Sequence, residues 1–170
     1  MDIAAYIRNI EDFPTKGVAF KDITPLLNNA EARAKTLEML IEKLNGHTVD
    51  KVVGIESRGF FFGTLLAQAL NAGFIPVRKP GKLPYTTFSQ EYTLEYGTDM
   101  LQIHTDAIFP DEKILLHDDV LATGGTAEAT CRLIEKLGGN IVQCSFLMEL
   151  DFLNGREKIK KYDVQSLLHY

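Results

Sequence analysis

Residues 114–126 decide the fold, and their sequence is Ile-Leu-Leu-His-Asp-Asp-Val-Leu-Ala-Thr-Gly-Gly-Thr. The apolar start predicts a buried strand over 114–117, which leads into two adjacent acids and then a turn of small residues. After Gly124, apolar residues recur at helical spacing as far as Leu137, which predicts a helix. A buried strand that runs through a short turn into a helix is typical of a βαβ unit.

The same alternation continues on both sides of this stretch. It predicts one α/β domain over residues 1–170, with a mostly parallel, twisted sheet and helices on both faces. Further strands are predicted at 51–55, 74–77, 141–147 and 164–168, with an edge strand at 100–103. Further helices are predicted within 1–12, over 30–44 and from Gly59 to Gly73.

Composition and charge exclude several classes of protein. Of the 170 residues, 45% are hydrophobic and 24% charged, with 13 Gly and 6 Pro, which excludes disordered, collagen-like and disulfide-scaffold chains. The net charge of −5 argues against unspecific binding to nucleic acid or anionic membranes. Cys131 and Cys144 are expected to be buried free thiols. Without a signal peptide or a long apolar run, the chain is expected in the cytoplasm.

The turn after the strand 114–117 has the composition of a phosphate site. Glycines allow close backbone approach, amides at a helix N-terminus attract anions, and Thr123 and Thr126 add hydroxyl donors. The upstream acids Asp118 and Asp119 suit the two hydroxyls of a ribose, or a Mg²⁺ ion with its waters. Together they predict a site for ribose 5-phosphate. The alternative is an ordinary turn with acidic caps.

This segment resembles the phosphoribosyl-diphosphate signature of the type I phosphoribosyltransferases. Further motifs are similar to those of the adenine-specific members of that family, in the same order along nearly the whole chain. They are Phe13-Pro14, Gly17–Ile23, Gly54–Phe60, Arg78–Pro84 and Tyr92–Gly97.

The resemblance implies transfer of the 5-phosphoribosyl group from 5-phospho-α-D-ribosyl 1-diphosphate to adenine, which gives AMP and diphosphate. It implies Mg²⁺ held mainly by the substrate diphosphate and water, and a homodimer in which Arg78 reaches the neighbouring subunit's site. A small N-terminal hood over the base (about 1–30) and a mobile active-site loop (about 78–99) are also implied. The rivals are a transferase for hypoxanthine, guanine or another base, and a regulator that binds the sugar diphosphate and DNA. The second would need a basic surface or an added DNA-binding module.

The resemblance also assigns residues to roles. Ribose 5-phosphate is expected at Asp118, Asp119, Ala122, Thr123, Gly124, Gly125 and Thr126. Diphosphate is expected at Glu56, Ser57, Arg58, Arg78, Lys79 and Lys82, and adenine at Ala19, Phe20 and Lys21. Glu95, Arg58 and Tyr96 are the expected catalytic residues.

Each role has a plainer alternative. Arg58 could form a surface salt bridge, and the cations at 78–82 could be a solvated charge run. Phe20 could belong to the core, and Glu95 could be a solvent-facing strand residue. His117 is predicted to be a packed structural histidine.

Overall fold

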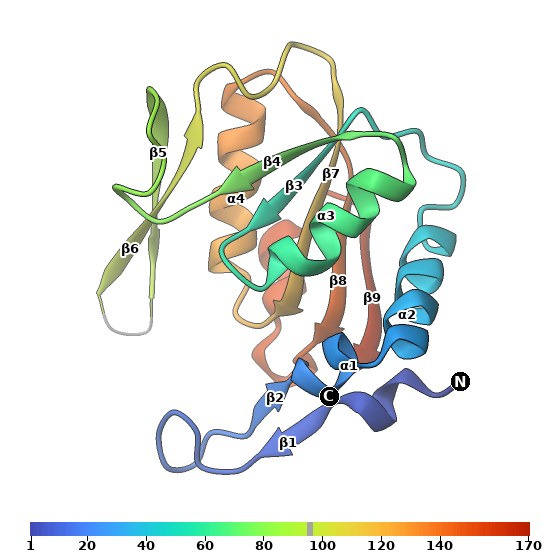
Figure 1. The fold of residues 1–170 in the computed structure, drawn as a ribbon. Coiled ribbons are helices and arrows are strands. Elements are labelled where there is room, and N and C mark those ends of the chain that lie inside the picture. The colour runs from blue at the N-terminus through green and yellow to red at the C-terminus, as the bar shows by residue number, and fades with distance from the viewer. Residues whose placement is uncertain (95–96) are drawn as a thin grey trace. The chain divides into compact units, whose positions relative to one another are not determined.

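Strand β7 (Lys113–Leu121) is the central strand of the sheet in the computed structural model, which describes residues 1–94 and 97–170. It has parallel partners on both sides, and its apolar residues Ile114–Leu116 and Leu121 are buried. The five-stranded sheet has the order β4-β3-β7-β8-β9, and every pairing in it is parallel (Figure 1). The other strands are β3 (Lys51–Ile55), β4 (Gly73–Val77), β8 (Asn140–Glu149) and β9 (Val164–His169).

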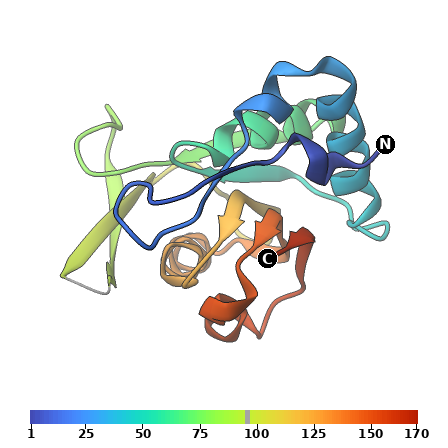
Figure 2. The same ribbon diagram turned by 90° about the horizontal axis from the view of Figure 1, so that it is seen from below.

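Helices α3 (Gly59–Ala69) and α4 (Gly125–Lys136) cover opposite faces of this sheet (Figure 2). The connection β3-α3-β4 runs toward one edge and β7-α4-β8 toward the other. Because both crossovers are right-handed, their helices must fall on different faces. Helix α4 buries Ala127, Cys131 and Ile134, and it ends before Gly138, whose φ is 85°. The predicted mostly parallel sheet with helices on both faces is therefore confirmed.

Further strands and short 3₁₀ helices belong to the unit formed by Lys43–Tyr170. Strands β5 (Thr87–Thr93) and β6 (Thr98–His104) form an antiparallel hairpin, and the side chains of Phe88 and Tyr92 pack against the main apolar core. The connection from β8 to β9 contains two short 3₁₀ helices, η2 (Asp151–Leu153) and η3 (Gly155–Ile159).

Residues Met1–Glu42 form a second compact unit, which contains the predicted hood segment. Its elements are η1 (Ile3–Tyr6), β1 (Arg8–Ile10), β2 (Phe20–Asp22), α1 (Thr24–Asn28) and α2 (Ala30–Glu42). The prediction of helix 30–44 is confirmed, and the Asn29 side chain caps α2 by accepting a hydrogen bond from the Ala32 amide at 2.9 Å.

The predicted helix over residues 1–12 is wrong beyond its first turn. Strand β1 pairs antiparallel with β2 instead, and Arg8 forms an ion pair with Asp22 at 2.6 Å. An isolated short helix is marginal in water, so the pairing with a distant segment outweighs the helical spacing of the apolar residues.

Two strand predictions also need correction. The predicted edge strand at 100–103 lies in β6, which pairs with β5 outside the five-stranded sheet and is linked to the end of β4 by a bridge between Arg78 and Gln102. The segment 78–99, which the resemblance predicts to be a mobile loop, contains the regular strand β5, because Phe88 and Tyr92 supply an apolar face that packs against the core.

Candidate active site

The carboxyl ends of β3 and β7 lie next to each other, since Gly54 pairs with His117. From these two strands the chain crosses over in opposite directions, so this is the topological switch point of the sheet. Ligands of open α/β sheets bind in the crevice at such a point. The loop after β3 (56–58) and the loop after β7 (122–124) therefore lie at the position where a ligand is expected.

The loop after β7 closes around one cavity. Asp118, Ala122, Thr123, Gly124 and Thr126 line it together with the apolar residues Val120, Leu121 and Ala127. These five are members of the predicted ribose 5-phosphate group. Of the other two, Asp119 contacts Arg58, and Gly125 lines a separate hollow beside Tyr92 and Lys158.

The acid pair lies inside the strand rather than after it, which corrects the predicted strand end at 117. Asp118 opposes Phe146 of β8, and the strand continues through Val120 and Leu121. The strand continues past residue 117 because Asp118, Val120 and Leu121 pair with β8, and because Val120 and Leu121 are apolar.

Burial and mutual repulsion control the ionisation of the two acids. Burial and the negative charge of Asp119 raise the pKa of Asp118 well above its ordinary value. Burial also raises the pKa of Asp119, while the charge of Arg58 opposes that rise. Arg58 Nε lies 2.9 Å from Asp119 Oδ2, and the Asp119 amide donates to Asp118 Oδ1 at 2.9 Å. Arg58 thus joins the two loops through an acid of the site.

Gly59 allows this close approach of the two loops. A Cβ atom at residue 59 would lie 2.8 Å from Asp118 Oδ1 and 3.0 Å from the His117 carbonyl oxygen. The first distance is shorter than real Cβ contacts and the second is tighter than most of them, so glycine at this position lets the start of α3 lie against the acid pair.

Two of the predicted diphosphate-binding cations, Arg78 and Lys82, contact Glu56. Arg78 Nε lies 3.3 Å from Glu56 Oε2, the Lys79 amide donates to the same oxygen at 2.8 Å, and Lys82 contacts Oε1. Burial alone would raise the pKa of Glu56, but the contacts from Lys82, Lys79 and Arg78 outweigh it and hold the pKa below its ordinary value. The basic segment is therefore organised around a carboxylate and is not a solvated charge run.

The Lys79 ammonium group is engaged elsewhere. It contacts Asp99 of β6, whose carboxylate also accepts a hydrogen bond from the Tyr92 hydroxyl at 3.1 Å. This contact ties the start of the segment 78–99 to its own hairpin. Ser57 is exposed, and its carbonyl oxygen accepts the Phe60 amide at 3.1 Å as α3 begins.

The predicted adenine-binding residues lie in the first unit. Phe20 and Lys21 are half-buried in β2, and the Phe20 ring meets that of Phe13 edge-on at 5.2 Å between centroids. Ala19 is exposed immediately before this strand. The catalytic predictions for Glu95 and Tyr96 fall outside the residues that the structure describes.

Two smaller predictions are confirmed. His117 is fully buried, and burial lowers its pKa to about 3 although the Ser145 backbone opposes the shift, so the ring is neutral. Cys131 and Cys144 are buried free thiols with their sulfur atoms 3.8 Å apart.

Sequence reasoning missed the contribution of η3 to the site. Gly155 packs against Ala122 and Gly124, and Lys158 lies beside Gly125. The Asn154-Gly155 dipeptide is a turn signal that could have marked this connection, but nothing local indicates which loop it contacts.

Comparison with known proteins agrees with this geometry. The family model "Phosphoribosyl transferase domain" matches residues 25–168. Adenine phosphoribosyltransferases of Flavobacterium johnsoniae and Christiangramia forsetii are 65% and 63% identical over 170 residues, which cover 100% of this chain and 100% and 99% of theirs. This chain belongs to the adenine phosphoribosyltransferase family.

Solved structures of the family superpose closely on the chain. The adenine phosphoribosyltransferase of Thermoanaerobacter pseudethanolicus is 51% identical with a TM-score of 0.97, and the match covers 99% of this chain and 98% of that one. That of Saccharomyces cerevisiae, complexed with an imino-altritol bisphosphate and adenine, is 39% identical with a TM-score of 0.91, and the match covers 96% and 95%. Over the described residues, no helix has the length and apolarity to cross a membrane.

Proposed function

We propose that the chain transfers the 5-phosphoribosyl group of 5-phospho-α-D-ribosyl 1-diphosphate to adenine, releasing AMP and diphosphate in purine salvage. The observation that carries this proposal is the cavity at the switch point, which is lined by Asp118, Ala122, Thr123, Gly124 and Thr126. Glu56, which follows the neighbouring strand β3, contacts the cations Arg78 and Lys82, which follow β4. The yeast relative's complex with a bisphosphate and adenine supports the same ligand class.

The loop after β7 would bind the ribose 5-phosphate. Its backbone amides and the hydroxyls of Thr123 and Thr126 suit the phosphate, which the N-terminus of α4 would also attract. Asp118 lines the cavity and would accept hydrogen bonds from the ribose hydroxyls, with Asp119 behind it. The position of C1′ would then be fixed between the two loops, which lowers the entropic part of the barrier.

The cations after β3 and β4 would bind the diphosphate. Arg58, Arg78 and Lys82 each contact a carboxylate in the present arrangement, so a bound diphosphate would replace Asp119 and Glu56 as their anionic partner. As the bond from C1′ to the diphosphate breaks, negative charge grows on the leaving group. Cations already held nearby would stabilise that charge.

The donor chemistry fits a Mg²⁺ ion that arrives with its substrate. The acid pair supplies carboxylate oxygens, but Asp119 is already paired with Arg58, so the pair offers no full set of oxygen ligands. Mg²⁺ commonly keeps several waters and binds through substrate phosphates plus one or two carboxylates. When bound, it would neutralise part of the diphosphate charge.

The base would be held by the N-terminal unit. The Phe20 ring would stack on the purine, and the backbone of Ala19 and Lys21 would contact its edge. We assign the handling of the purine's imidazole proton to Glu95 and the shielding of the ribose to Tyr96, both on the basis of the motif resemblance. Closure of the segment 78–99 would exclude water from the reacting sugar.

The active form is proposed to be a homodimer in which Arg78 also reaches the neighbouring subunit's site. We also propose that it works in the cytoplasm. Cys131 and Cys144 are free thiols although their sulfur atoms lie only 3.8 Å apart, which suits a reducing compartment.

The test is a turnover assay with purified protein, Mg²⁺ and phosphoribosyl diphosphate, in which each free base is offered in turn. AMP and diphosphate should form from adenine, and excess chelator should abolish the reaction. Faster turnover of hypoxanthine or guanine would refute the base assignment, and full activity in chelator would refute the metal requirement.

A further inference from the structure

The 3₁₀ helix η3 lies against the loop after β7 (122–124), called the phosphate loop below. It is far from that loop in sequence and outside every motif described above. The contact is made between two backbones. A Cβ atom at Gly124 would overlap the Gly155 carbonyl oxygen, and one at Gly155 would overlap the Ala122 carbonyl oxygen and lie 2.8 Å from the Gly124 nitrogen. The two glycines therefore make an interlocked contact in which neither can accept a side chain.

The contact falls on the residue that shapes the turn. Gly124 has φ of 80° and precedes α4 directly, so its conformation sets where the first amides of that helix point. Gly155 has no such positive φ and needs to be glycine only because the loop lies so close. A substitution at Gly155 therefore tests the close packing against the loop without also straining a positive φ.

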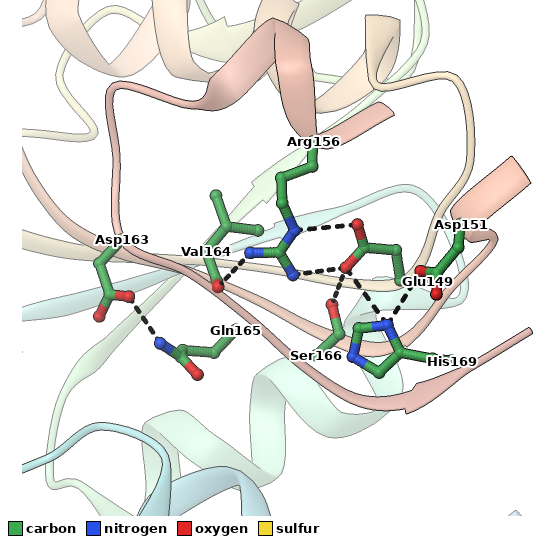
Figure 3. A network of polar contacts seen from close by, with 8 residues as sticks. All are labelled: Glu149, Asp151, Arg156, Asp163, Val164, Gln165, Ser166 and His169. Carbon is green, nitrogen blue, oxygen red and sulfur yellow. Dashed lines mark hydrogen bonds and ion pairs between the residues drawn. The ribbon is translucent and has the colours of Figure 1, made fainter. Parts of the chain in front are cut away.

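An ion pair between Arg156 and the buried Glu149 fixes η3 in place (Figure 3). Arg156, the residue after Gly155, donates to both oxygens of Glu149 at 3.0 and 2.5 Å and to the Val164 carbonyl at 2.7 Å. Ser166 donates to Glu149 at 2.9 Å. The Glu149 carboxylate lies at the end of β8 and its side chain is only 6% exposed. Arg156 therefore connects η3 to both β8 and β9.

The same cluster includes Asp151 and His169, whose ring nitrogen lies 2.9 Å from Asp151. Although Glu149, Asp151 and His169 offer ligand atoms close together, both oxygens of Glu149 already accept from Arg156. The cluster is therefore assigned to structure rather than to a metal ion.

We propose that Gly155 and Arg156 are positioning residues for the ribose 5-phosphate. The Glu149–Arg156 pair holds η3 so that the Gly155 backbone keeps the turn at Gly124 in its binding conformation. This inference rests on the proposed function of that turn. It assigns part of the substrate affinity to two residues outside the predicted ribose 5-phosphate group.

The test compares two Gly→Ala variants that each create a collision, one against backbone atoms and one against a core side chain. Gly155→Ala clashes with the phosphate loop, whereas Gly139→Ala places a Cβ atom 2.7 Å from Ile134 Cγ2 in the core. Both should lower the melting temperature. Only Gly155→Ala should raise the Kd for ribose 5-phosphate and the KM for phosphoribosyl diphosphate, by about 10-fold or more, with kcat at saturation little changed.

A second pair of variants covers the case in which Gly155→Ala does not fold. Arg156→Lys keeps the charge but cannot reach both Glu149 oxygens and Val164 together, and it should raise the same Kd several-fold. Arg132→Lys on α4, whose partner is the exposed Glu128, should not.

The possible results distinguish a failure of the positioning role from a failure of the proposed function. Equal effects of Gly155→Ala and Gly139→Ala, or a wild-type Kd in Arg156→Lys, with an active wild-type enzyme, would overturn the positioning role alone. A wild-type protein that neither binds ribose 5-phosphate nor turns over would overturn the proposed function itself.

Discussion

The loops after β7 and β3 meet at one switch point but are built in different ways. The loop after β7 is shaped by backbone contacts, with Gly124 locked against Gly155, and its cavity is lined by amides, hydroxyls and small residues. The region after β3 is shaped by side-chain ion pairs, in which Arg58 contacts Asp119 and both Arg78 and Lys82 contact Glu56.

This difference suggests two modes of binding. The first loop is preorganised and would accept a phosphate without rearranging. The second would have to exchange its internal carboxylates for the diphosphate, so its affinity is a difference between two sets of ion pairs. Substitutions in the first loop should therefore act sterically and lower the ligand affinity severely. Substitutions in the second should act electrostatically, and the moderate loss of affinity should depend on salt.

The largest effect is expected from a residue that belongs to neither loop. Glu95→Gln should lower kcat by roughly 10²–10⁴-fold if this side chain transfers a proton, while the Kd for phosphoribosyl diphosphate stays near that of the wild type. Steady-state kinetics and calorimetry measure the two quantities. A wild-type kcat would remove Glu95 from the chemistry, and a lost affinity would make it a binding residue.

Gly124→Ala should break the preorganised loop. The added methyl group overlaps the Gly155 carbonyl, and the φ of 80° is strained for alanine. We expect kcat/KM for phosphoribosyl diphosphate to fall by about 10²-fold. Gly46→Ala is the control, because Gly46 has φ of 83° with open space around it. Similar losses in both variants would mean that backbone strain, not the shape of the loop, is responsible.

Asp118→Asn should weaken ribose 5-phosphate binding by about 1–3 kcal/mol through lost charged hydrogen bonds, and Asp119→Asn should do the same. Because Arg58 contacts Asp119, the second variant should also alter diphosphate affinity. Calorimetric titration of each ligand separates the two effects. Unchanged affinity in both variants would contradict the ribose assignment.

Lys82→Ala should have a smaller effect, since its side chain is 47% exposed. We expect a loss of about 1 kcal/mol in diphosphate affinity, which diminishes as salt is added. Lys160→Ala is the matched control, because its pair with Glu157 is exposed and remote in sequence from every predicted motif. A loss that does not depend on salt would argue against a mainly electrostatic role.

His117→Leu should leave activity nearly unchanged and alter only the pH dependence of stability. In the wild type, the folded-state pKa of about 3 lies below the ordinary value of 6.5, so between these values the unfolded state binds the extra proton. The wild type should therefore lose about 2 kcal/mol of unfolding free energy between pH 7 and pH 5 from this residue.

The variant should lack that loss, as denaturant titrations at the two pH values can measure. His47→Leu, at an exposed position, is the control. Parallel pH profiles for the wild type and His117→Leu would contradict the buried neutral histidine.

The sequence predicted the parallel sheet well because each of its strands contains a short apolar run. The strand predicted at 51–55 is β3, and the predicted helix after Gly124 is α4. It failed where pairing with a distant segment decided the structure. Strand β1 exists because of β2, and β7 extends through its acids because β8 pairs with them.

Site residues were likewise predictable where the local sequence carries the signal, and not where a distant segment does. Glycine and threonine at a strand–helix turn indicate a phosphate site from the local sequence alone. Most of the predicted ribose 5-phosphate residues accordingly line one cavity. The partnership of Glu56 with Arg78 and Lys82, and that of Gly155 with Gly124, join residues more than twenty positions apart. Only tertiary packing brings such pairs together.

Separate titration of the two halves of the substrate tests the division of labour between the loops most directly. Ribose 5-phosphate and Mg²⁺-diphosphate would each be titrated calorimetrically into the wild type, Gly124→Ala and Lys82→Ala. The account predicts that Gly124→Ala loses ribose 5-phosphate and retains diphosphate, and that Lys82→Ala weakens diphosphate alone. If each variant weakened both ligands equally, the two loops would act as one site and the division of labour would be contradicted.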